Sequence, residues 1–455
     1  MVNWIPPDWE DAEMLKSLGI GTVEELFRDI PKRARMGRIG LQPSLDEASL
    51  AARVRGLLER NKPLSGYDIF LGGGFYDRYT PAVVDGILQR SEFYTSYTPY
   101  QAEASQGTLQ SLFEFQSLWV ELTNMEVANA SLYDGASALA EGLLMAGRLH
   151  EGSRVLVPGN LHWERRSVLE NYARGARLTL VDIPWDRSTG LLDFDFIRQE
   201  SAKDVAGVIV ELPDSLGIVD GRLPTLKSMI GDVPLVVSAD PMALTLLEPP
   251  GSWGADIVVA EGQGFGIPLS YGGPYLGLMA TRNAAVRQLP GRLVGATKDA
   301  RGRRAFTLTL QTREQHIRRS RATSNVCTNH SLMALAFVSY ATVLGPRGLQ
   351  RLALAQAKRV RSLATALGSV RGLRAPLFSA PYLMDVTVGV EGMKVSEFLA
   401  GMARKKVLAG TALGDPRPSA RGPEPNAFVT SAGEGIDDKA IERFTKAASA
   451  VLGGG

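Results

Sequence analysis

One run of residues has the composition of a phosphate-binding turn. The sequence Tyr133-Asp-Gly-Ala-Ser-Ala lies where a predicted strand meets a predicted helix. Free backbone N–H groups and the helix dipole make such a helix start attract phosphate. The candidate binding residues are Asp134, Gly135, Ala136 and Ser137. The alternative interpretation is an ordinary helix cap followed by small residues that allow close packing.

A carboxylate follows a second predicted strand. Asp240 ends the apolar stretch Leu235-Val-Val-Ser-Ala-Asp, and the carboxyl end of a parallel strand faces the usual ligand crevice of an α/β sheet. A phosphate cradle together with a strand-end Asp suggests a pyridoxal-phosphate fold, where the Asp pairs with the pyridinium nitrogen. A capping or loop carboxylate is the alternative.

That hypothesis requires a lysine that forms a Schiff base with the cofactor. The chain has no lysine between Lys227 and Lys298, and the place where one would be sought holds Gln263 and Gly264. Lys298 lies in the polar segment Thr297-Lys-Asp-Ala-Arg-Gly, which predicts an exposed turn. We therefore expect a cofactor-binding scaffold that lacks its own nucleophile.

Three further features could carry chemistry. The block 92–107, Glu-Phe-Tyr-Thr-Ser-Tyr-Thr-Pro-Tyr-Gln-Ala-Glu-Ala-Ser-Gln-Gly, is too polar for a core strand and too aromatic for a simple loop, although a turn that merely packs is the alternative. The block 306–329, rich in Arg and Gln, predicts a solvated or salt-bridged helical face. His162 starts a predicted helix above the sheet, where an acid or base role competes with a structural one.

Composition excludes several classes of protein. The 455 residues are 45% hydrophobic and 22% charged, with a net charge of +2, so we expect neither intrinsic disorder nor a basic field that recruits nucleic acid or membrane. The single cysteine, Cys327, cannot form an internal disulfide, and no Cys/His spacing suggests a metal site. The start of the sequence shows no signal-peptide pattern, and no apolar run approaches about 20 residues. We expect a cytoplasmic protein.

The elements that must position these residues form three segments. Residues 1–65 predict a helical extension, with helices near 8–30 and 44–61. Residues 66–330 form the large domain, in which Val/Ile/Leu-rich strands alternate with helices and indicate an α/β fold with a mainly parallel sheet covered on both faces. Residues 331–455 predict a smaller α+β domain. It begins with a long helix over about 329–344 that ends at Gly345-Pro346, and it closes with a helix over 437–452.

Four stretches of the chain resemble one family. They are Phe93-Tyr-Thr-Ser-Tyr-Thr-Pro-Tyr-Gln-Ala-Glu-Ala-Ser-Gln-Gly, Tyr133-Asp-Gly-Ala-Ser-Ala-Leu-Ala-Glu, Gly254-Ala-Asp-Ile-Val-Val-Ala-Glu-Gly-Gln and Leu308-Thr-Leu-Gln-Thr-Arg-Glu-Gln-His-Ile-Arg-Arg. All four look like the glycine decarboxylase P-protein, in its subunit 1 or alpha half. The resemblance implies a fold-type-I pyridoxal-phosphate architecture with a mainly parallel seven-stranded sheet.

The same resemblance implies a heteromeric enzyme. In an α2β2 assembly the beta subunit would bind pyridoxal 5'-phosphate, and the alpha subunit would have lost the Schiff-base lysine. Glycine would lose carbon dioxide there and pass its aminomethyl group to the lipoyl arm of the H-protein. No residue of this chain alone would be catalytic.

The resemblance also assigns residues. Five side chains of the aromatic block would reach toward the partner's active site: Tyr94, Ser96, Tyr97, Tyr100 and Gln106. A degenerate cofactor site would remain in this chain, made of Asp134, Gly135, Ala136, Ser137, His162, Asp240, Gln263 and Gly264.

The sequence departs from the family pattern at four places. His162 is followed by Trp163 rather than Pro, an Asn-Pro-Asn motif appears as Leu212-Pro-Asp, Gln-Pro-Leu-Gly appears as Gln263-Gly-Phe-Gly, and a Thr-Glu pair appears as Ser431-Ala432. Two alternatives therefore stay open. One is a specialised paralogue that acts on another amino acid with its own beta-like partner, and the other is a non-catalytic scaffold or regulatory subunit.

Overall fold

The structure is a computed structural model that describes residues 9–36, 40–414 and 425–453, and it divides the chain into two units, Met1–Gly66 and Tyr67–Gly455. The first unit contains α1 (Trp9–Ser17), the 3-10 helices η1 (Val23–Phe27) and η2 (Lys32–Ala34), and α2 (Glu47–Leu58). Asp46 caps α2 by accepting the Ser49 N–H at 2.9 Å. The helix expected over 8–30 is interrupted after Ser17, because Gly19 takes a φ of 69°. None of residues 12–36 and 40–66 is buried.

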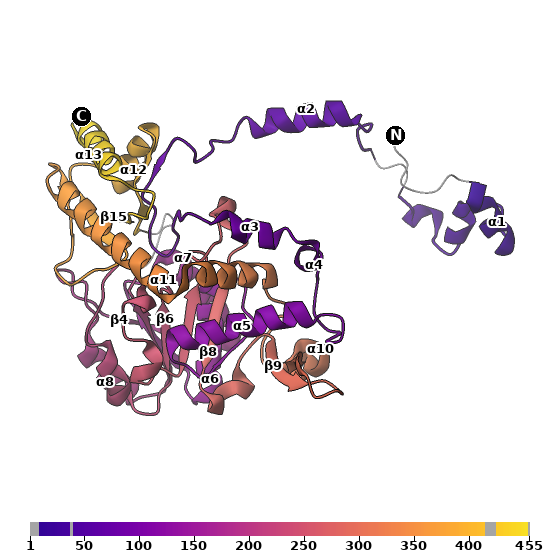
Figure 1. Cartoon of the computed structure of the whole chain (residues 1–455), viewed down its shortest axis with the longest axis horizontal. Helices are drawn as coiled ribbons and strands as arrows, with labels where there is room; N and C mark the ends of the chain where they lie inside the picture. Colours follow the sequence, from indigo (N-terminus) through magenta and orange to yellow (C-terminus); the bar gives the residue numbers. More distant parts are fainter. Residues whose placement is uncertain (1–8, 37–39, 415–424, 454–455) are drawn as a thin grey trace. The chain divides into compact units, whose positions relative to one another are not determined.

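A seven-stranded sheet forms the centre of the second unit (Figure 1). Its order is β2 (Val127–Ala128), β8 (Gly277–Thr281), β7 (Ile257–Glu261), β6 (Leu235–Ala239), β5 (Val205–Leu212), β3 (Arg154–Pro158) and β4 (Thr179–Ile183). The five strands from β7 to β4 are parallel to one another, whereas β8 is antiparallel to both β7 and β2. The predicted α/β fold with a mainly parallel sheet is confirmed.

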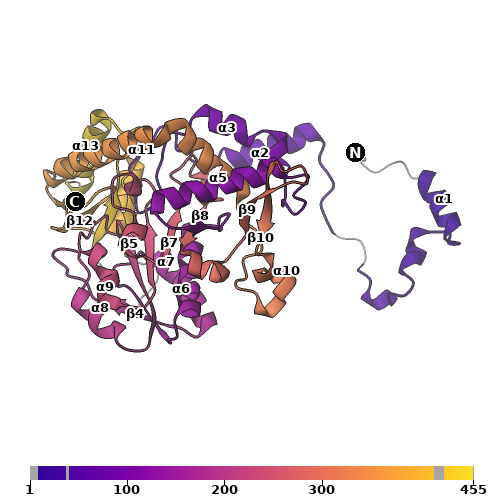
Figure 2. The same ribbon diagram turned by 60° about the horizontal axis from the view of Figure 1, so that its bottom comes forward.

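Helices cover both faces of this sheet, because successive strand residues point to opposite sides. On β3, Leu156 joins the core beneath α5 (Gln106–Thr123) and α11 (Ser331–Gly368), while its neighbours Val155 and Val157 join the core beneath α6 (Gly135–Leu149) and α7 (Trp163–Ala176). Figure 2 shows the two pairs of helices on opposite sides of the strands. The helices α8 (Phe194–Ser201) and α9 (Leu226–Ile230) pack with the α5 face.

The last part of the chain builds a second, smaller sheet. Its order is β11 (Leu373–Arg374), β12 (Val386–Val390), β15 (Ala427–Thr430) and β14 (Thr411–Ala412), all antiparallel. Two helices, α12 (Val395–Arg404) and α13 (Asp438–Leu452), share a buried core with it. The helix predicted over 437–452 is confirmed as α13, with Asp437 as its cap. The short strand β13 (Val407–Leu408) pairs in parallel with β1 (Asp68–Ile69).

The long helix α11 corrects one expectation. We predicted that it ends at Gly345-Pro346, but the helical path resumes there and reaches Gly368. Gly345 takes a φ of 62° and a ψ of 174°, which kinks the helix without ending it. By length and hydropathy α11 could cross a membrane. Half of its most apolar window is buried inside the protein, as in a core helix.

The block 306–329 also differs from the prediction. Its first residues belong to β10 (Arg304–Thr309), which pairs antiparallel with β9 (Leu293–Lys298), and only the short α10 (Gln315–Arg318) is α-helical. Arg313 is buried and donates to the backbone carbonyls of Leu289, Leu310 and Gly291 instead of facing solvent. The irregular path follows from the left-handed backbone of Leu310 and Arg319, with φ values of 51° and 52°.

Candidate functional site

A small cavity lies where the carboxyl ends of β5, β6 and β7 meet. Its volume is about 40 Å³, far below the about 300–1,000 Å³ of pockets that hold small-molecule ligands. The walls come from these strand ends, the start of α6, one residue of α7, the segment before α3 (Ala82–Leu88) and the residue before β12. The lining residues are Gly73, Gly74, Tyr76, Gly135, Arg165, Pro213, Asp214, Ser215, Ser238, Ala239, Asp240, Glu261 and Asp385.

The start of α6 is occupied by a carboxylate from the protein itself. Glu261, the last residue of β7, accepts the backbone N–H of Gly135 at 2.8 Å, of Gln263 at 2.9 Å and of Leu276 at 3.1 Å. A Cβ on Gly135 would lie 2.7 Å from the Glu261 Cβ, so only glycine allows this approach. A carboxyl group of the protein itself thus already occupies the helix start, where the sequence suggested phosphate.

The neighbouring residues form a capping box. The Asp134 side chain accepts the Ser137 N–H at 2.8 Å, and the Ser137 hydroxyl accepts the Asp134 N–H at 3.2 Å. Ala136 lies between them and has no polar side-chain atom. The structure therefore brings Asp134, Gly135, Ala136 and Ser137 together as a cap whose N–H groups at Gly135 and Ser137 are bonded within the chain.

Asp240 lies in the crevice, as its position after β6 predicts. It lines the cavity, and its carboxylate accepts the Ala243 N–H at 2.8 Å. At the place where a lysine would be sought, Gln263 is 1% exposed. Its amide accepts the Tyr76 N–H at 2.9 Å and donates to the Tyr76 carbonyl at 3.0 Å. Gly264 follows it, and a Cβ there would lie 3.0 Å from the Arg78 side chain.

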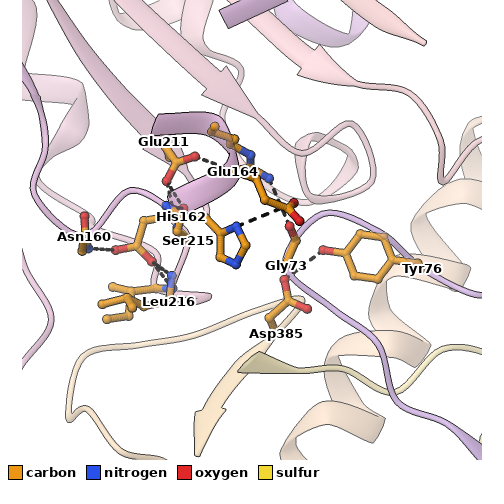
Figure 3. A network of polar contacts seen from close by, with 12 residues as sticks. Gly73, Tyr76, Asn160, His162, Glu164, Glu211, Ser215, Leu216 and Asp385 are labelled. Carbon is orange, nitrogen blue, oxygen red and sulfur yellow. Dashed lines mark hydrogen bonds and ion pairs between the residues drawn. The ribbon is translucent and has the colours of Figure 1, made fainter. Parts of the chain in front are cut away.

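The segment before α3 and the smaller sheet meet in the crevice through one pair of side chains. The Tyr76 hydroxyl donates to the Asp385 carboxylate at 2.9 Å, and both residues are buried (Figure 3). A Cβ on Gly72 would lie 2.3 Å from the same carboxylate, so the chain passes very close to it. Tyr76 and Asp385 are 309 residues apart in sequence, and they join the two parts of the second unit.

A second polar cluster lines the β5 side. The Glu211 carboxylate forms an ion pair with Arg165 from α7 and accepts two hydrogen bonds from Ser215, from its N–H at 3.0 Å and its hydroxyl at 2.5 Å. The Ser215 oxygen in turn accepts the His162 N–H at 3.0 Å (Figure 3). The His162 ring lies 3.8 Å from the Glu164 carboxylate. His162 is therefore part of a network that fixes the start of α7.

Three carboxyl groups around the cavity hold their protons more tightly than usual. Burial raises the pKa of Asp385 to about 7, the pKa of Asp214 to about 8, and the pKa of Glu261 to about 7. For Glu261 the three backbone N–H groups oppose this rise. Glu261 and Asp214 are both half-buried and line the small cavity. Near neutral pH these three carboxyl groups are therefore partly protonated, and the crevice is not an open anion site.

Pyridoxal phosphate does not fit this crevice. The phosphate position at the start of α6 holds the Glu261 carboxylate, the lysine position holds a neutral and fully hydrogen-bonded Gln263, and the remaining space is about 40 Å³. Only Asp240 still matches the group expected opposite the pyridinium nitrogen. The described residues contain no cluster of three His, Cys, Asp or Glu side chains able to hold a metal ion.

The aromatic block lies apart from the crevice and is open to solvent. Tyr97 is 85% exposed, Tyr94 69% and Tyr100 52%. Each tyrosine combines an apolar ring with a polar hydroxyl, as is common in residues that contact a partner protein. Ser96 is half-buried, and its hydroxyl lies 3.5 Å from that of Thr108.

Gln106 differs from the tyrosines. Its amide donates to the carbonyls of Ala102 at 2.7 Å and Phe306 at 2.8 Å and accepts the Phe306 N–H at 2.9 Å. It therefore ties the aromatic block to the edge of β10. Any contribution of Gln106 to a partner's site has to act through this anchoring, because its amide is used within the chain.

Sequence reasoning missed several of these residues. Glu261 could have been found by the argument that found Asp240, since it also ends a parallel strand. Tyr76 and Asp385 carried no pattern, because one belongs to an irregular segment and the other to the small sheet. Arg165 and Glu211 resembled ordinary helix and strand residues, and their pairing depends on how α7 lies against β5.

Comparison with known proteins places the chain in a family. The sequence model of the glycine cleavage system P-protein matches residues 3–409. The chain is 40% identical over 448 residues, or 98% of each chain, to the probable glycine dehydrogenase (decarboxylating) subunit 1 of Geobacillus sp. (strain WCH70). It is 47% identical over 351 residues to the protein of that name from Thermotoga maritima, covering 77% of this chain and 79% of the relative.

Solved structures show the same family and fold. A crystal structure of glycine decarboxylase (P-protein) of the glycine cleavage system, in inhibitor-bound form, has a TM-score of 0.89 and 36% identity and covers 99% of this chain and 100% of its own. A C-DES mutant with glycine linked covalently to its pyridoxal phosphate cofactor has a TM-score of 0.61 and 15% identity, covering 85% of this chain and 97% of its own. The second likeness concerns the fold alone, and together with the P-protein structure it confirms the predicted fold-type-I pyridoxal-phosphate fold.

Proposed function

The chain belongs to the glycine cleavage system P-protein family, and on that premise we propose that it is the alpha subunit of a heteromeric pyridoxal-phosphate-dependent glycine decarboxylase. It works in the cytoplasm with a beta subunit, subunit 2, in an α2β2 assembly. The beta subunit carries the cofactor and decarboxylates glycine. The aminomethyl group then passes to the lipoyl arm of the H-protein.

The observation that carries this proposal is the closed crevice. Glu261 fills the anion position at the start of α6, Gln263 stands where a Schiff-base lysine would be needed, and about 40 Å³ of space remains. A chain of this family that cannot hold the cofactor itself requires a partner that does. The degenerate site thus supplies a stable interior, and the chemistry takes place in the other subunit.

The aromatic block supports a contribution to that other site. Tyr94 and Tyr97 make no hydrogen bond through their hydroxyls to any described residue, and both are more than two-thirds exposed. Large exposed aromatic side chains with an unused polar end are typical of surfaces that become buried in a complex. We propose that Tyr94, Ser96, Tyr97 and Tyr100 complete the beta subunit's active site.

The first unit supports the assembly. Between residues 12 and 66 the described part of the chain has no buried residue, although leucines and other large apolar side chains recur along its helices. Helices of 9 and 12 residues are marginal in water on their own. We propose that the apolar side chains of this unit pack on the partner subunit. They include Met14, Leu18, Leu26, Phe27, Leu50, Val54 and Leu57.

The departures from the family pattern leave glycine as the proposed substrate. Asp214, Gln263 and Ser431 all use their side chains in hydrogen bonds within this chain. Ser431, for example, donates to the Met384 carbonyl at 2.7 Å and accepts the Gln356 amide at 3.1 Å. None of these changes lies in the exposed aromatic block, so they alter the closed crevice and leave the proposed contact with the partner unchanged.

Co-expression with subunit 2 tests the proposal. We expect a stable complex that releases carbon dioxide from glycine when lipoyl H-protein is present, and no activity from this chain alone. A complex that binds pyridoxal phosphate but does not decarboxylate glycine would support the alternative of a specialised paralogue that acts on another amino acid. A complex whose turnover does not depend on the Tyr97 and Tyr100 side chains would support the scaffold.

A further inference from the structure

Arg292 is a buried cation close to the aromatic block. It follows Gly291, whose φ is 75°, and lies directly before β9. Its side chain is almost fully shielded, since the residue is only 3% exposed. An arginine guanidinium keeps its charge in proteins, and a buried charge is costly unless other groups compensate for it.

The groups around Arg292 compensate for it only with neutral oxygens. Its two terminal nitrogens donate to Asn329 Oδ1 at 3.2 Å, the Cys327 carbonyl at 3.1 Å, Thr98 Oγ1 at 3.4 Å and the Tyr100 hydroxyl oxygen at 3.3 Å. The Nε atom has no hydrogen-bond partner in the described part of the chain, and no acidic residue described there forms an ion pair with Arg292. Its positive charge is therefore not neutralised by this subunit.

Tyr100 connects the buried guanidinium to the protein surface. Arg292 lies 5.3 Å from the centre of the Tyr100 ring and donates to its oxygen, while the tyrosine is 52% exposed. Because the phenol oxygen accepts from the guanidinium, its own proton is free to be donated outward. A hydroxyl that accepts from a cation becomes a stronger donor, particularly where water is excluded.

Arg292 also fixes where Tyr100 lies. Its bonds to Thr98 and Tyr100 hold the aromatic block, and its bonds to Cys327 and Asn329 hold the segment before α11. Asn329 is in turn anchored by donating to the Ala130 carbonyl at 2.6 Å. One buried side chain thus links the exposed tyrosine to the rigid sheet.

We propose that Arg292 is a positioning residue that orients and polarises Tyr100, so that the Tyr100 O–H donates to an oxyanion in the partner subunit's active site. This rests on the proposed function, which brings the aromatic block to that site. The oxyanion is the carboxylate of the amino-acid substrate or the phosphate of the cofactor, and both accept the same hydrogen bond.

The test uses the assembled complex with subunit 2 and a double-mutant cycle. Tyr100→Phe removes only the hydroxyl, and Arg292→Met removes the charge at similar length. Each change is expected to raise either the KM for glycine or the cofactor dissociation constant about 10-fold, as for loss of a hydrogen bond to a charged group. A rise in KM alone identifies the substrate carboxylate, and a rise in cofactor dissociation identifies the phosphate.

The cycle separates positioning from a merely structural role. If Arg292 acts through Tyr100, then Arg292→Met adds less than about 2-fold in the Tyr100→Phe background. Equal effects of Arg292→Met in both backgrounds, or no effect of Tyr100→Phe, would overturn the proposal. Arg292→Lys keeps the charge and is expected to recover part of the loss, which gives a second variant should Arg292→Met not assemble.

Matched controls come from the same chain. Tyr79→Phe changes a tyrosine that is 72% exposed and outside this cluster, and Arg148→Met changes a partly buried arginine that donates to the Gln288 carbonyl at 2.9 Å. Both are expected to keep wild-type KM and cofactor affinity. An inactive wild-type complex would refute the proposed function itself, whereas an active complex insensitive to Tyr100→Phe would refute only the role of Arg292.

Discussion

The side-chain carboxylate of Glu261 accepts the backbone N–H of Gly135 at 2.8 Å, so the start of α6 is bonded to an acidic group of the same chain. In a pyridoxal-phosphate fold this helix start is the natural place for the cofactor phosphate. Glu261 occupies that place with its own carboxyl group and ties the N-terminus of α6 to the end of β7. These bonds hold the start of α6 within the chain's own interior.

Removing this carboxylate is predicted to reopen an anion site. Glu261→Ala leaves the N–H groups of Gly135, Gln263 and Leu276 without their acceptor. We expect about 10 mM inorganic phosphate to raise the thermal midpoint of the variant and not of the wild type, since a ligand stabilises the state that binds it. Glu141→Ala, which removes a buried carboxylate elsewhere on α6, should show no response. A phosphate response in the wild type would contradict the account.

Gly135→Ala is predicted to destabilise the protein by about 1–3 kcal/mol, because the added methyl overpacks a filled space. The new Cβ would lie 2.7 Å from the Glu261 Cβ and 3.0 Å from its Cα. Gly175→Ala on α7 meets nothing within 4 Å and should be neutral or stabilising. Urea unfolding of both variants measures the difference, and equal midpoints would show that the approach of α6 to β7 is looser than described.

Stability is predicted to fall as pH rises from about 4 to about 8. The folded pKa values of Asp385, Glu261 and Asp214 are raised to about 7, about 7 and about 8 from ordinary values of 3.8 to 4.5. The folded state therefore binds more protons than the unfolded chain in that window, so deprotonation disfavours folding. Asp385→Asn keeps an acceptor for the Tyr76 hydroxyl. It should reduce the loss of unfolding free energy between pH 5.5 and pH 8.5, as measured by denaturant titration at each pH. An unchanged loss of unfolding free energy between these two pH values would count against a raised pKa at Asp385.

Replacing Tyr97 and Tyr100 together by Ala is predicted to lower glycine decarboxylation at least about 10-fold, because the block is proposed to complete the beta subunit's active site. This chain should stay folded, because both side chains are exposed and bury little within it, and we expect the complex to stay assembled. Carbon dioxide release from labelled glycine and size-exclusion chromatography measure the two properties. Dissociation of the complex with unaltered residual chemistry would assign the block to assembly instead. Tyr79→Phe and Tyr79→Ala serve as controls on an exposed tyrosine outside the block.

Much of the fold could be predicted because it depends on local patterns. The Val/Ile/Leu strands and intervening helices indicated the parallel sheet, and Asp437 indicated the start of α13. The kink at Gly345 was harder, because the packing of α11 on two cores outweighs the usual effect of Gly-Pro. The block after residue 306 was predicted only in part: residues 315–321 are exposed, as expected, whereas the buried Arg313 looks like a solvated arginine in sequence.

The candidate site was predictable only in part. The lysine gap and Asp240 could be seen from spacing, since both depend on strand ends. The Tyr76–Asp385 pair and the surroundings of Arg292 could not, because each joins segments far apart in the chain. Such contacts depend on how the small sheet and the segment before α11 lie against the large one.

The most direct test of the central claim is borohydride reduction of the assembled complex, followed by mass spectrometry of both chains. Reduction fixes pyridoxal phosphate to the lysine that carries it. We expect a stoichiometric adduct on a lysine of the partner subunit and none on this chain, including Lys298. A stoichiometric adduct on any lysine of this chain would contradict the central claim.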